Sequence, residues 1–347
     1  MTGNVTKVKE TDLSRIGVIG AGSWGTTLAN HLAGKGLEVD LWAREPEVLR
    51  QIEEHRENRT FLPGVELYPS LRGVGSFEEA LVEKRLVLMV VPSHVFREVL
   101  IGMKPYLRSG VTFMTGTKGI ENESLMMMSE VAESVLGQSL TQGFACLSGP
   151  SFAREVSGRY PTAVTIACRD MEYAGVLQRL FYSEYFRVYT TQDLVGVQLG
   201  GALKNVVAIA AGASDALGFG HNARAALITR GLAEIARVGV SMGANPHTFA
   251  GLAGMGDLVL TCTGDLSRNR TVGFKIGTGM SLEKITESMS MVAEGIKTAR
   301  SAHELGLKMG VDMPITRQVF EILYEKKDPR EAVKELMTRA LKAELEH

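Results

Sequence analysis

The stretch RIGVIGAGSWGTTLANHLAGKGLEVDLW, residues 15–42, predicts a strand, a glycine turn, a helix and a second strand in succession. Residues 15–20 are apolar, rich in β-branched side chains and end in glycine, which is typical of a buried parallel strand. A helical pattern follows over residues 23–34, and residues 37–42 form the second predicted strand. A strand, a helix and a strand within roughly 30 residues make a βαβ unit.

The turn of this unit carries the pattern GxGxxG at Gly20, Gly22 and Gly25. Gly20 permits the tight turn, Gly22 lets the backbone approach a pyrophosphate, and Gly25 allows close packing of helix on strand. The free amides at the N-terminus of the helix then face the anion. The motif alone is a weak signal, but its position between a strand and a helix predicts a dinucleotide site.

The residues after the second strand bear on which dinucleotide is bound. Sites that prefer NAD often carry an acidic residue ~20 residues beyond the glycines, where it holds the ribose hydroxyls. Here Arg44 occupies that region, and Glu45 stands one position late. A guanidinium can donate hydrogen bonds to a 2′-phosphate and stack on adenine. We therefore expect NADP(H), with use of NAD(H) left open; the alternative for Arg44 is a solvated surface charge.

Strand and helix patterns alternate up to about residue 190. Further strands are expected at 86–91, 111–115, 144–147, 163–167 and 186–189, with helices between several of them, including 93–103 and 125–135. Such alternation predicts a mostly parallel sheet covered on both faces. The later patterns are apolar or helical, at 193–217, 229–242, 282–288, 295–305, 316–324 and 329–345. We expect an α/β fold: a Rossmann-like, doubly wound N-terminal domain over 1–190, then an all-α substrate-binding domain over 191–347.

The composition excludes several classes of protein. Lys and Arg number 38 against 39 Asp and Glu, so the basic excess that marks a nucleic-acid binder is absent. The three cysteines have no CxxC spacing, which favours reduced packing thiols and no metal site. No secretory signal is visible, and no apolar run approaches the ~20 residues that span a bilayer. We expect a cytoplasmic protein without a nucleic-acid partner or membrane insertion.

The segment GVQLGGALKNVVA, residues 196–208, predicts a helix with one cation in a face of small residues. By i, i+3 and i+4 spacing that face carries Gly200, Gly201, Lys204, Ala208 and Ala211. Two glycines in a helix cost about 1–2 kcal/mol against alanine, so something must approach the backbone closely. A lysine partly desolvated there, near another cation, should have a lowered pKa and could serve as a general acid or base. The alternative is a lysine that snorkels out of a core helix.

Two loops of the first domain carry further candidates. Lys118 follows the predicted strand 111–115, where ligands of such sheets bind, although it could also be an exposed surface lysine. His94 follows the strand 86–91. It has no visible carboxylate partner, and we interpret it as a loop or packing histidine rather than a catalytic base.

A phosphate pocket is expected in the second domain. The segment 254–258 resembles a flexible glycine loop with one acid, Asp257, which could hold a substrate hydroxyl or the lysine. Ser267 is a good N-cap, and the free amides behind it favour an anion. Arg268 adds a planar guanidinium that can donate two parallel hydrogen bonds to a phosphate, and the amide of Asn269 can also donate a hydrogen bond. Together these residues predict a small phosphorylated substrate.

Taken together, the motifs resemble the NAD(P)-dependent glycerol-3-phosphate dehydrogenases of bacterial type. The likeness runs from residue 15 to residue 337. The matching pieces are GAGSWGT at 20–26, VVPSH at 90–94, TKG at 117–119, SGPSFA at 148–153, GVQLGGALKN at 196–205, GLAGMGDLVLTC at 251–262, SRNR at 267–270 and VAEG at 292–295.

This resemblance implies roles for individual residues. The implied cofactor contacts beyond the glycines are Ser23, Trp24, Arg44, Lys118, Ala153, Arg268, Val292 and Glu294. The implied contacts with a three-carbon phosphate substrate are Lys118, Gly149, Ser151, Lys204, Asp257, Ser267, Arg268 and Asn269. Lys204 would be the proton acceptor. The resemblance also implies a cytoplasmic role, the supply of sn-glycerol 3-phosphate from dihydroxyacetone phosphate for phospholipid synthesis.

Two other functions are left open by the residues alone. A related helical-domain dehydrogenase for a larger hydroxy acid would want a carboxylate-binding pocket in place of the cluster at 267–270. A non-catalytic NAD(P) sensor would need neither Lys204 among glycines nor a separate anion site. The sequence also leaves open whether the chain forms a homodimer.

Overall fold

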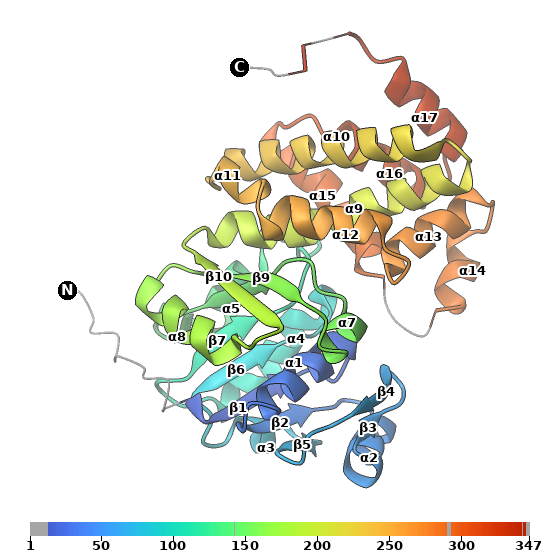
Figure 1. The fold of residues 1–347 in the computed structure, drawn as a ribbon. Helices are drawn as coiled ribbons and strands as arrows, with labels where there is room; N and C mark the ends of the chain where they lie inside the picture. Colours follow the sequence, from blue (N-terminus) through green and yellow to red (C-terminus); the bar gives the residue numbers. More distant parts are fainter. Residues whose placement is uncertain (1–12, 142, 290–292, 342, 345–347) are drawn as a thin grey trace.

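The structure, a computed structural model, describes residues 13–141, 143–289, 293–341 and 343–344. Its first part is an eight-stranded sheet of order β10-β9-β8-β7-β6-β1-β2-β5 (Figure 1). The strands are β1 (Arg15–Ile19), β2 (Glu38–Trp42), β5 (Leu71–Val74), β6 (Leu86–Met89), β7 (Thr112–Thr115), β8 (Ala145–Ser148), β9 (Thr162–Cys168) and β10 (Phe186–Thr191). All pairings in this sheet are parallel except that of β8 with β9.

Helices cover both faces of the sheet, as the alternating pattern predicts. One apolar core joins the sheet to α1 (Ser23–Ala33), α2 (Pro46–His55) and α8 (Met171–Phe181). The core on the opposite face joins it to α3 (Phe77–Leu81), α4 (Phe96–Met103) and α5 (Met128–Leu136). Shorter helices are α6 (Gln138–Thr141) and α7 (Ala153–Ser157). The mostly parallel, doubly wound sheet is therefore confirmed.

The described chain after β10 is helical (Figure 1). Its elements are α9 (Leu194–Ala216), α10 (Gly220–Ser241), α11 (Pro246–Phe249), a π-helical turn (Leu252–Gly256), α12 (Asp257–Thr263), α13 (Arg268–Gly277), α14 (Leu282–Glu287), α15 (Glu294–Met309), α16 (Pro314–Tyr324) and α17 (Pro329–Met337). The helix expected over 329–345 is too long, because α17 ends at Met337. The fully exposed Leu341 beyond it has no apolar face to pack against.

The central helix of this second part is α9. By length and composition it could cross a membrane, which the sequence interpretation above does not anticipate. However, 89% of its most apolar window is buried inside the protein. Its side chains form a core with those of α10, α12, α13, α15 and α16. The helix is therefore the core of the helical part.

The sequence patterns do not predict three strands. These are β5 and a two-stranded antiparallel hairpin of β3 (Glu57–Asn58) and β4 (Leu62–Glu66), which lies between α2 and β5 in the chain. β4 reads LPGVE, with a proline and a glycine that disfavour a strand. β5 reads LRGV, and Gly73 is needed there because a Cβ would lie 2.9 Å from Leu49 and 3.1 Å from Ile52 of α2.

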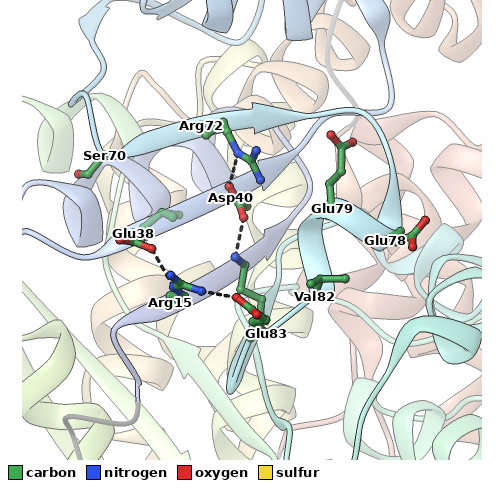
Figure 2. Close-up of a pocket in the computed structure, with 11 residues that line it drawn as sticks. Arg15, Glu38, Asp40, Ser70, Arg72, Glu78, Glu79, Val82 and Glu83 are labelled. Atoms are coloured by element: carbon green, nitrogen blue, oxygen red, sulfur yellow. Dashed lines mark hydrogen bonds and ion pairs between the residues drawn. The ribbon is translucent and has the colours of Figure 1, made fainter.

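A cluster of charged side chains lies at the amino ends of β1, β2 and β5 (Figure 2). Asp40 accepts from Arg72 Nε at 2.8 Å and from Lys84 Nζ at 2.5 Å, while Arg15 pairs with Glu38 and Glu83. Burial opposes the charge on Asp40, but the two hydrogen bonds outweigh it and lower the pKa of this carboxyl group. Since the central charges are paired with one another, this cluster is structural.

Candidate active site

Lys204, Lys118 and Asp257 converge where the sheet meets the helical part. Lys204 Nζ on α9 donates to Asp257 Oδ1 at 2.5 Å and to Thr261 Oγ1 at 2.7 Å. Lys118 Nζ, from the loop after β7, donates to Asp257 Oδ2 at 2.6 Å and to the carbonyl oxygen of Gly149 at 3.3 Å. One buried carboxylate thus holds two amines from different parts of the chain.

The environment of Lys204 sets its protonation. Lys204 is 6% exposed and Asp257 is 1% exposed. Burial lowers the pKa of Lys204 to about 8; the charge of Asp257 opposes this change, and the charge of Lys118 adds to it. The amine therefore carries a proton at neutral pH but can give it up within the physiological range, which is the property of a general acid and base.

The glycines around Lys204 admit neighbouring protein atoms. A Cβ at Gly200 would lie 2.4 Å from the carbonyl oxygen of Ala253, in the π-helical turn. A Cβ at Gly201 would lie 2.7 Å from the hydroxyl of Ser148, at the end of β8. These contacts allow both the π-helical turn and the sheet to press directly on α9. The close approach expected from the sequence is thus made by the protein itself.

Asp257 is the first residue of α12, directly after the π-helical turn. The prediction of a flexible loop over 254–258 is therefore wrong. The glycines there serve packing: a Cβ at Gly254 would lie 2.2 Å from the carbonyl oxygen of Phe249. A rigid turn fixes the carboxylate against α9, and Thr261, one helical turn after Asp257, adds a second acceptor for the amine. The sequence interpretation missed Thr261, although its i+4 spacing from Asp257 is visible.

The loop after β8 lines the same place. Gly149 has a φ of +135°, which favours glycine, and a Cβ there would lie 3.0 Å from Val164. Its carbonyl oxygen accepts from Lys118 and also from Ser151 Oγ at 3.0 Å. Lys118 and Ser151 therefore share the carbonyl oxygen of Gly149 as acceptor. That these three residues contact the substrate stays a prediction from the resemblance.

The N-terminus of α13 is held against α9 by backbone contact. A Cβ at Gly273 would lie 1.9 Å from the carbonyl oxygen of Ile209, and one at Gly212 would lie 2.0 Å from that of Arg270. No side chain separates the two helices at these points. This contact brings the first turn of α13 against α9, where Asn269 bonds to Asn205, the residue after Lys204.

The residues of that first turn differ in their surroundings. Ser267 is the N-cap, and its hydroxyl accepts from the amide of Arg270 at 3.2 Å. Asn269 donates to Asn205 Oδ1 at 2.8 Å and accepts from the amide of Gly295 at 2.9 Å. Arg268 is exposed.

Arg270, in the same turn, is held by two carboxylates. Its guanidinium donates to Asp215 and to Asp265, each at 2.9 Å. Because Asp215 lies on α9, this pair fastens α13 to α9 at the same end that carries Arg268.

The glycine loop has the geometry expected of a dinucleotide turn. Gly20 has a φ of +116°, and a Cβ at Gly25 would lie 1.9 Å from the carbonyl oxygen of Gly20. By contrast, a Cβ at Gly22 would meet nothing within 4 Å. The protein therefore leaves open space in front of Gly22, next to Ser23 at the start of α1. The buried Nε1 of Trp24, beside Gly116, has no hydrogen-bond partner among the described residues. These features fit a coenzyme pyrophosphate at this loop.

The remaining implied cofactor residues surround this loop. Arg44 lies two residues beyond Trp42, whose carbonyl oxygen accepts from the amide of Gly20. The Arg44 side chain is 71% exposed and donates through Nε and Nη2 to Glu45 Oε1, at 3.0 and 2.6 Å. Ala153 begins α7, and its carbonyl oxygen accepts from Thr27 of α1 at 3.3 Å.

Glu294 brings the helical part to the end of β6. It begins α15, and its Oε2 accepts from the hydroxyl of Ser93 at 2.8 Å. Burial raises the pKa of Glu294, and the bonds from Ser93 and the charge of Arg268 oppose this change. His94 is exposed, in keeping with a loop histidine. Val292 lies outside the described residues.

Comparisons with known proteins identify the family. Residues 15–174 match the model of the NAD-dependent glycerol-3-phosphate dehydrogenase N-terminus, and residues 193–334 match the model of its C-terminus. The chain belongs to the NAD-dependent glycerol-3-phosphate dehydrogenase family. It is 60% identical over 330 residues to the glycerol-3-phosphate dehydrogenase (NAD(P)+) of Geobacter metallireducens, covering 95% of this chain and 98% of the relative. The corresponding protein of Syntrophobacter fumaroxidans is 54% identical over 331 residues, covering 95% and 97%.

The fold agrees with this family. A crystal structure of glycerol-3-phosphate dehydrogenase from Coxiella burnetii superposes with a TM-score of 0.90 at 40% identity, covering 94% of this chain and 99% of that one. The protein is therefore an enzyme, a glycerol-3-phosphate dehydrogenase that uses NAD(P). The alternatives of a hydroxy-acid dehydrogenase and of a non-catalytic sensor are set aside.

Proposed function

We propose that this dehydrogenase reduces dihydroxyacetone phosphate to sn-glycerol 3-phosphate in the cytoplasm and so supplies phospholipid synthesis. In this proposal Lys204 is the group that exchanges the proton. The observation that supports it is the buried amine of Lys204, held at 2.5 Å by Asp257 and with its pKa lowered to about 8. The division at residue 190 is part of the proposal: the sheet side holds the coenzyme and the helical side brings the catalytic amine.

The proton balance of the reaction follows from this geometry. When bound, the nicotinamide supplies a hydride in reduction and accepts one in oxidation. In reduction the Lys204 ammonium donates a proton to the carbonyl oxygen, which becomes the C2 hydroxyl, and solvent later restores the proton. In oxidation the neutral amine of Lys204 takes the hydroxyl proton. Asp257 orients the amine, since its Oδ1 accepts one of the three N–H groups.

The substrate phosphate would be bound at the start of α13. Ser267 ends the preceding loop as N-cap, and Arg268 and Asn269 form the first turn, where free amides and a guanidinium favour an anion. Lys118 and Gly149, with Ser151, would hold the hydroxymethyl end beside Asp257. The coenzyme would lie on Gly20, Gly22, Ser23, Trp24 and Gly25, with Arg44 toward a 2′-phosphate and with Ala153 and Glu294 around it.

The test is the variant Lys204→Met, which keeps the aliphatic stem and removes the amine. We expect kcat to fall by about 100- to 10,000-fold, the usual contribution of a positioned acid or base, while NADPH still binds. Lys84→Met is the matched control, because Lys84 is also buried and paired with a carboxylate, Asp40, but lies just before β6, at the amino end of the sheet. Equal losses in the two variants, or near-normal turnover of Lys204→Met, would refute the assignment.

A further inference from the structure

The hairpin β3–β4 contacts the glycine loop through one side chain, Asn58. This residue is fully buried. Its Nδ2 donates to the carbonyl oxygen of Ala21 and to Thr26 Oγ1, both at 2.8 Å, and its Oδ1 accepts from the amide of Phe61 at 3.0 Å. The NH2 group of the side chain thus donates to the loop and to the first turn of α1, while its oxygen accepts from the hairpin.

The bond to Ala21 fixes a peptide plane of the loop. The carbonyl of Ala21 shares its peptide group with the amide of Gly22, and in a planar trans peptide the C=O and N–H point in opposite directions. Thr26 Oγ1 reinforces the same carbonyl with a bond of 3.3 Å. Because Asn58 and Thr26 hold the oxygen on their side, the amide of Gly22 is turned away from them.

We propose that Asn58 is a positioning residue for the coenzyme: it locks the Ala21–Gly22 peptide so that the amides of the glycine loop are presented to the pyrophosphate. The inference rests on the proposed placement of the coenzyme at this loop. It assigns the hairpin, which has no counterpart in the minimal βαβ unit, a function in dinucleotide binding. Such preorganisation lowers the free-energy cost of ordering the loop when the anion binds.

A second asparagine supplies a matched control. Asn30 also lies on α1, one turn after Thr26, and is also buried. Its Nδ2 donates to the carbonyl oxygen of Glu66 at 3.0 Å, and its Oδ1 accepts from the amide of Tyr68 at 2.8 Å. Asn30 therefore fastens the far end of the same hairpin to α1, and its two bonds do not involve the glycine loop.

The experiment measures dissociation constants of NADPH and NADH by quenching of tryptophan fluorescence in the full chain. Asn58→Ala and Thr26→Val each remove a hydrogen bond to the carbonyl oxygen of Ala21. Each variant should therefore weaken both coenzymes by the same factor, about tenfold. The factor is the same because both coenzymes carry the pyrophosphate. Thr26→Ser keeps the hydroxyl and should bind as the parent does. The KM of dihydroxyacetone phosphate at saturating NADPH should stay within about twofold in all variants.

Three results would overturn the inference. One is an equal loss of coenzyme affinity in Asn30→Ala, which would mean that the effect comes from a loosened hairpin. Another is an unchanged affinity in folded Asn58→Ala. The third is a loss confined to NADPH, which would place the effect at the ribose. If Asn58→Ala does not fold, the coenzyme affinities of Thr26→Val and Thr26→Ser are compared instead, and equal affinities would overturn the inference.

Gly22→Val separates failure of this inference from failure of the proposed coenzyme site. A Cβ at Gly22 would meet no protein atom within 4 Å, so we expect the valine side chain to occupy the space in front of the loop and leave the fold intact. If Gly22→Val binds coenzyme normally, the proposed site itself is wrong. If Gly22→Val loses the coenzyme and Asn58→Ala does not, only the role of Asn58 is wrong.

Discussion

The amine of Lys204 lies 2.5 Å from Oδ1 of Asp257, inside a part of the protein that water barely reaches. The same carboxylate holds Lys118 through its other oxygen. Two positive charges and one negative charge therefore share the site before any substrate enters. The excess positive charge favours a phosphorylated substrate, while burial is what chiefly lowers the pKa of Lys204, with a smaller contribution from the charge of Lys118.

The pH dependence of the two directions should be opposite. The pKa of Lys204 is lowered to about 8, so the ammonium dominates below that pH and the neutral amine above it. In the proposed mechanism the reduction of dihydroxyacetone phosphate needs the ammonium, so its kcat should fall as pH rises through about 8. In the same mechanism the oxidation of glycerol 3-phosphate needs the neutral amine, so its kcat should rise through the same pH. Profiles of kcat from about pH 6 to 10 in both directions check this, and two parallel profiles would contradict it.

Removing the shared carboxylate charge should shift that profile. The negative charge of Asp257 raises the pKa of Lys204, so Asp257→Asn should lower this pKa below about 8. The pH at which kcat of the reduction falls should then be lower than in the parent. At neutral pH this kcat should fall by about 100-fold, as for loss of a general acid. The measurement is the pH profile of dihydroxyacetone phosphate reduction.

Asp40→Asn is the control for that variant. Asp40 is likewise a buried carboxylate that accepts from two cations, Arg72 and Lys84, at the other end of the sheet (Figure 2). The Asp40→Asn variant should have a lower melting temperature and the same pH profile of kcat as the parent. A profile of Asp257→Asn that matches the parent would show that Asp257 does not set the protonation of Lys204.

Arg44→Ala should separate the two coenzymes. Arg44 is exposed beside the glycine loop, and its guanidinium bonds to the carboxylate of Glu45. A guanidinium hydrogen-bonded to a 2′-phosphate contributes enough that its loss should raise the KM of NADPH about tenfold or more, and that of NADH by less than about threefold. Steady-state kinetics with both coenzymes measure this. Equal effects on the two would leave Arg44 outside the 2′-phosphate site.

Two alanine variants of the glycine loop should fail in different ways. Gly22→Ala places its methyl group in open space, so the melting temperature should hold while the KM of both coenzymes rises. Gly25→Ala forces a Cβ to within 1.9 Å of the Gly20 carbonyl oxygen, and overpacking of this kind costs about 1–3 kcal/mol. Thermal unfolding and coenzyme KM, measured together, check both. A stable Gly25→Ala with normal kinetics would contradict the packing argument.

The sequence predicts the elements that local patterns encode. β1, α1 and β2 lie within a residue or two of their expected bounds, because apolar periodicity and glycines define them. The hairpin is missed because its second strand contains Pro63 and Gly64, and it pairs only with itself. The antiparallel direction of β9 has no local signature, since direction depends on which neighbour a strand meets.

The candidate site is predictable in its residue types more than in its contacts. Spacing places Lys204 on a small-residue face, but only the fold shows that Asp257 holds it together with Lys118. Asn58 has no sequence signal, because its partners Ala21 and Thr26 are more than 30 residues away. Hydrogen bonds between distant segments depend on tertiary packing, which periodicity does not report.

In the proposed site, the glycine contact between α9 and α13 sets the distance between Lys204 and the phosphate-binding turn. The main chains of α9 and α13 touch at Gly212 and Gly273, so α9, which carries Lys204, and the start of α13 lie as close together as two backbones allow. No substitution by a smaller side chain can shorten this distance, and any larger residue at either glycine would push the helices apart. A redesign for a substrate with a longer carbon chain should therefore begin with larger residues at Gly212 and Gly273.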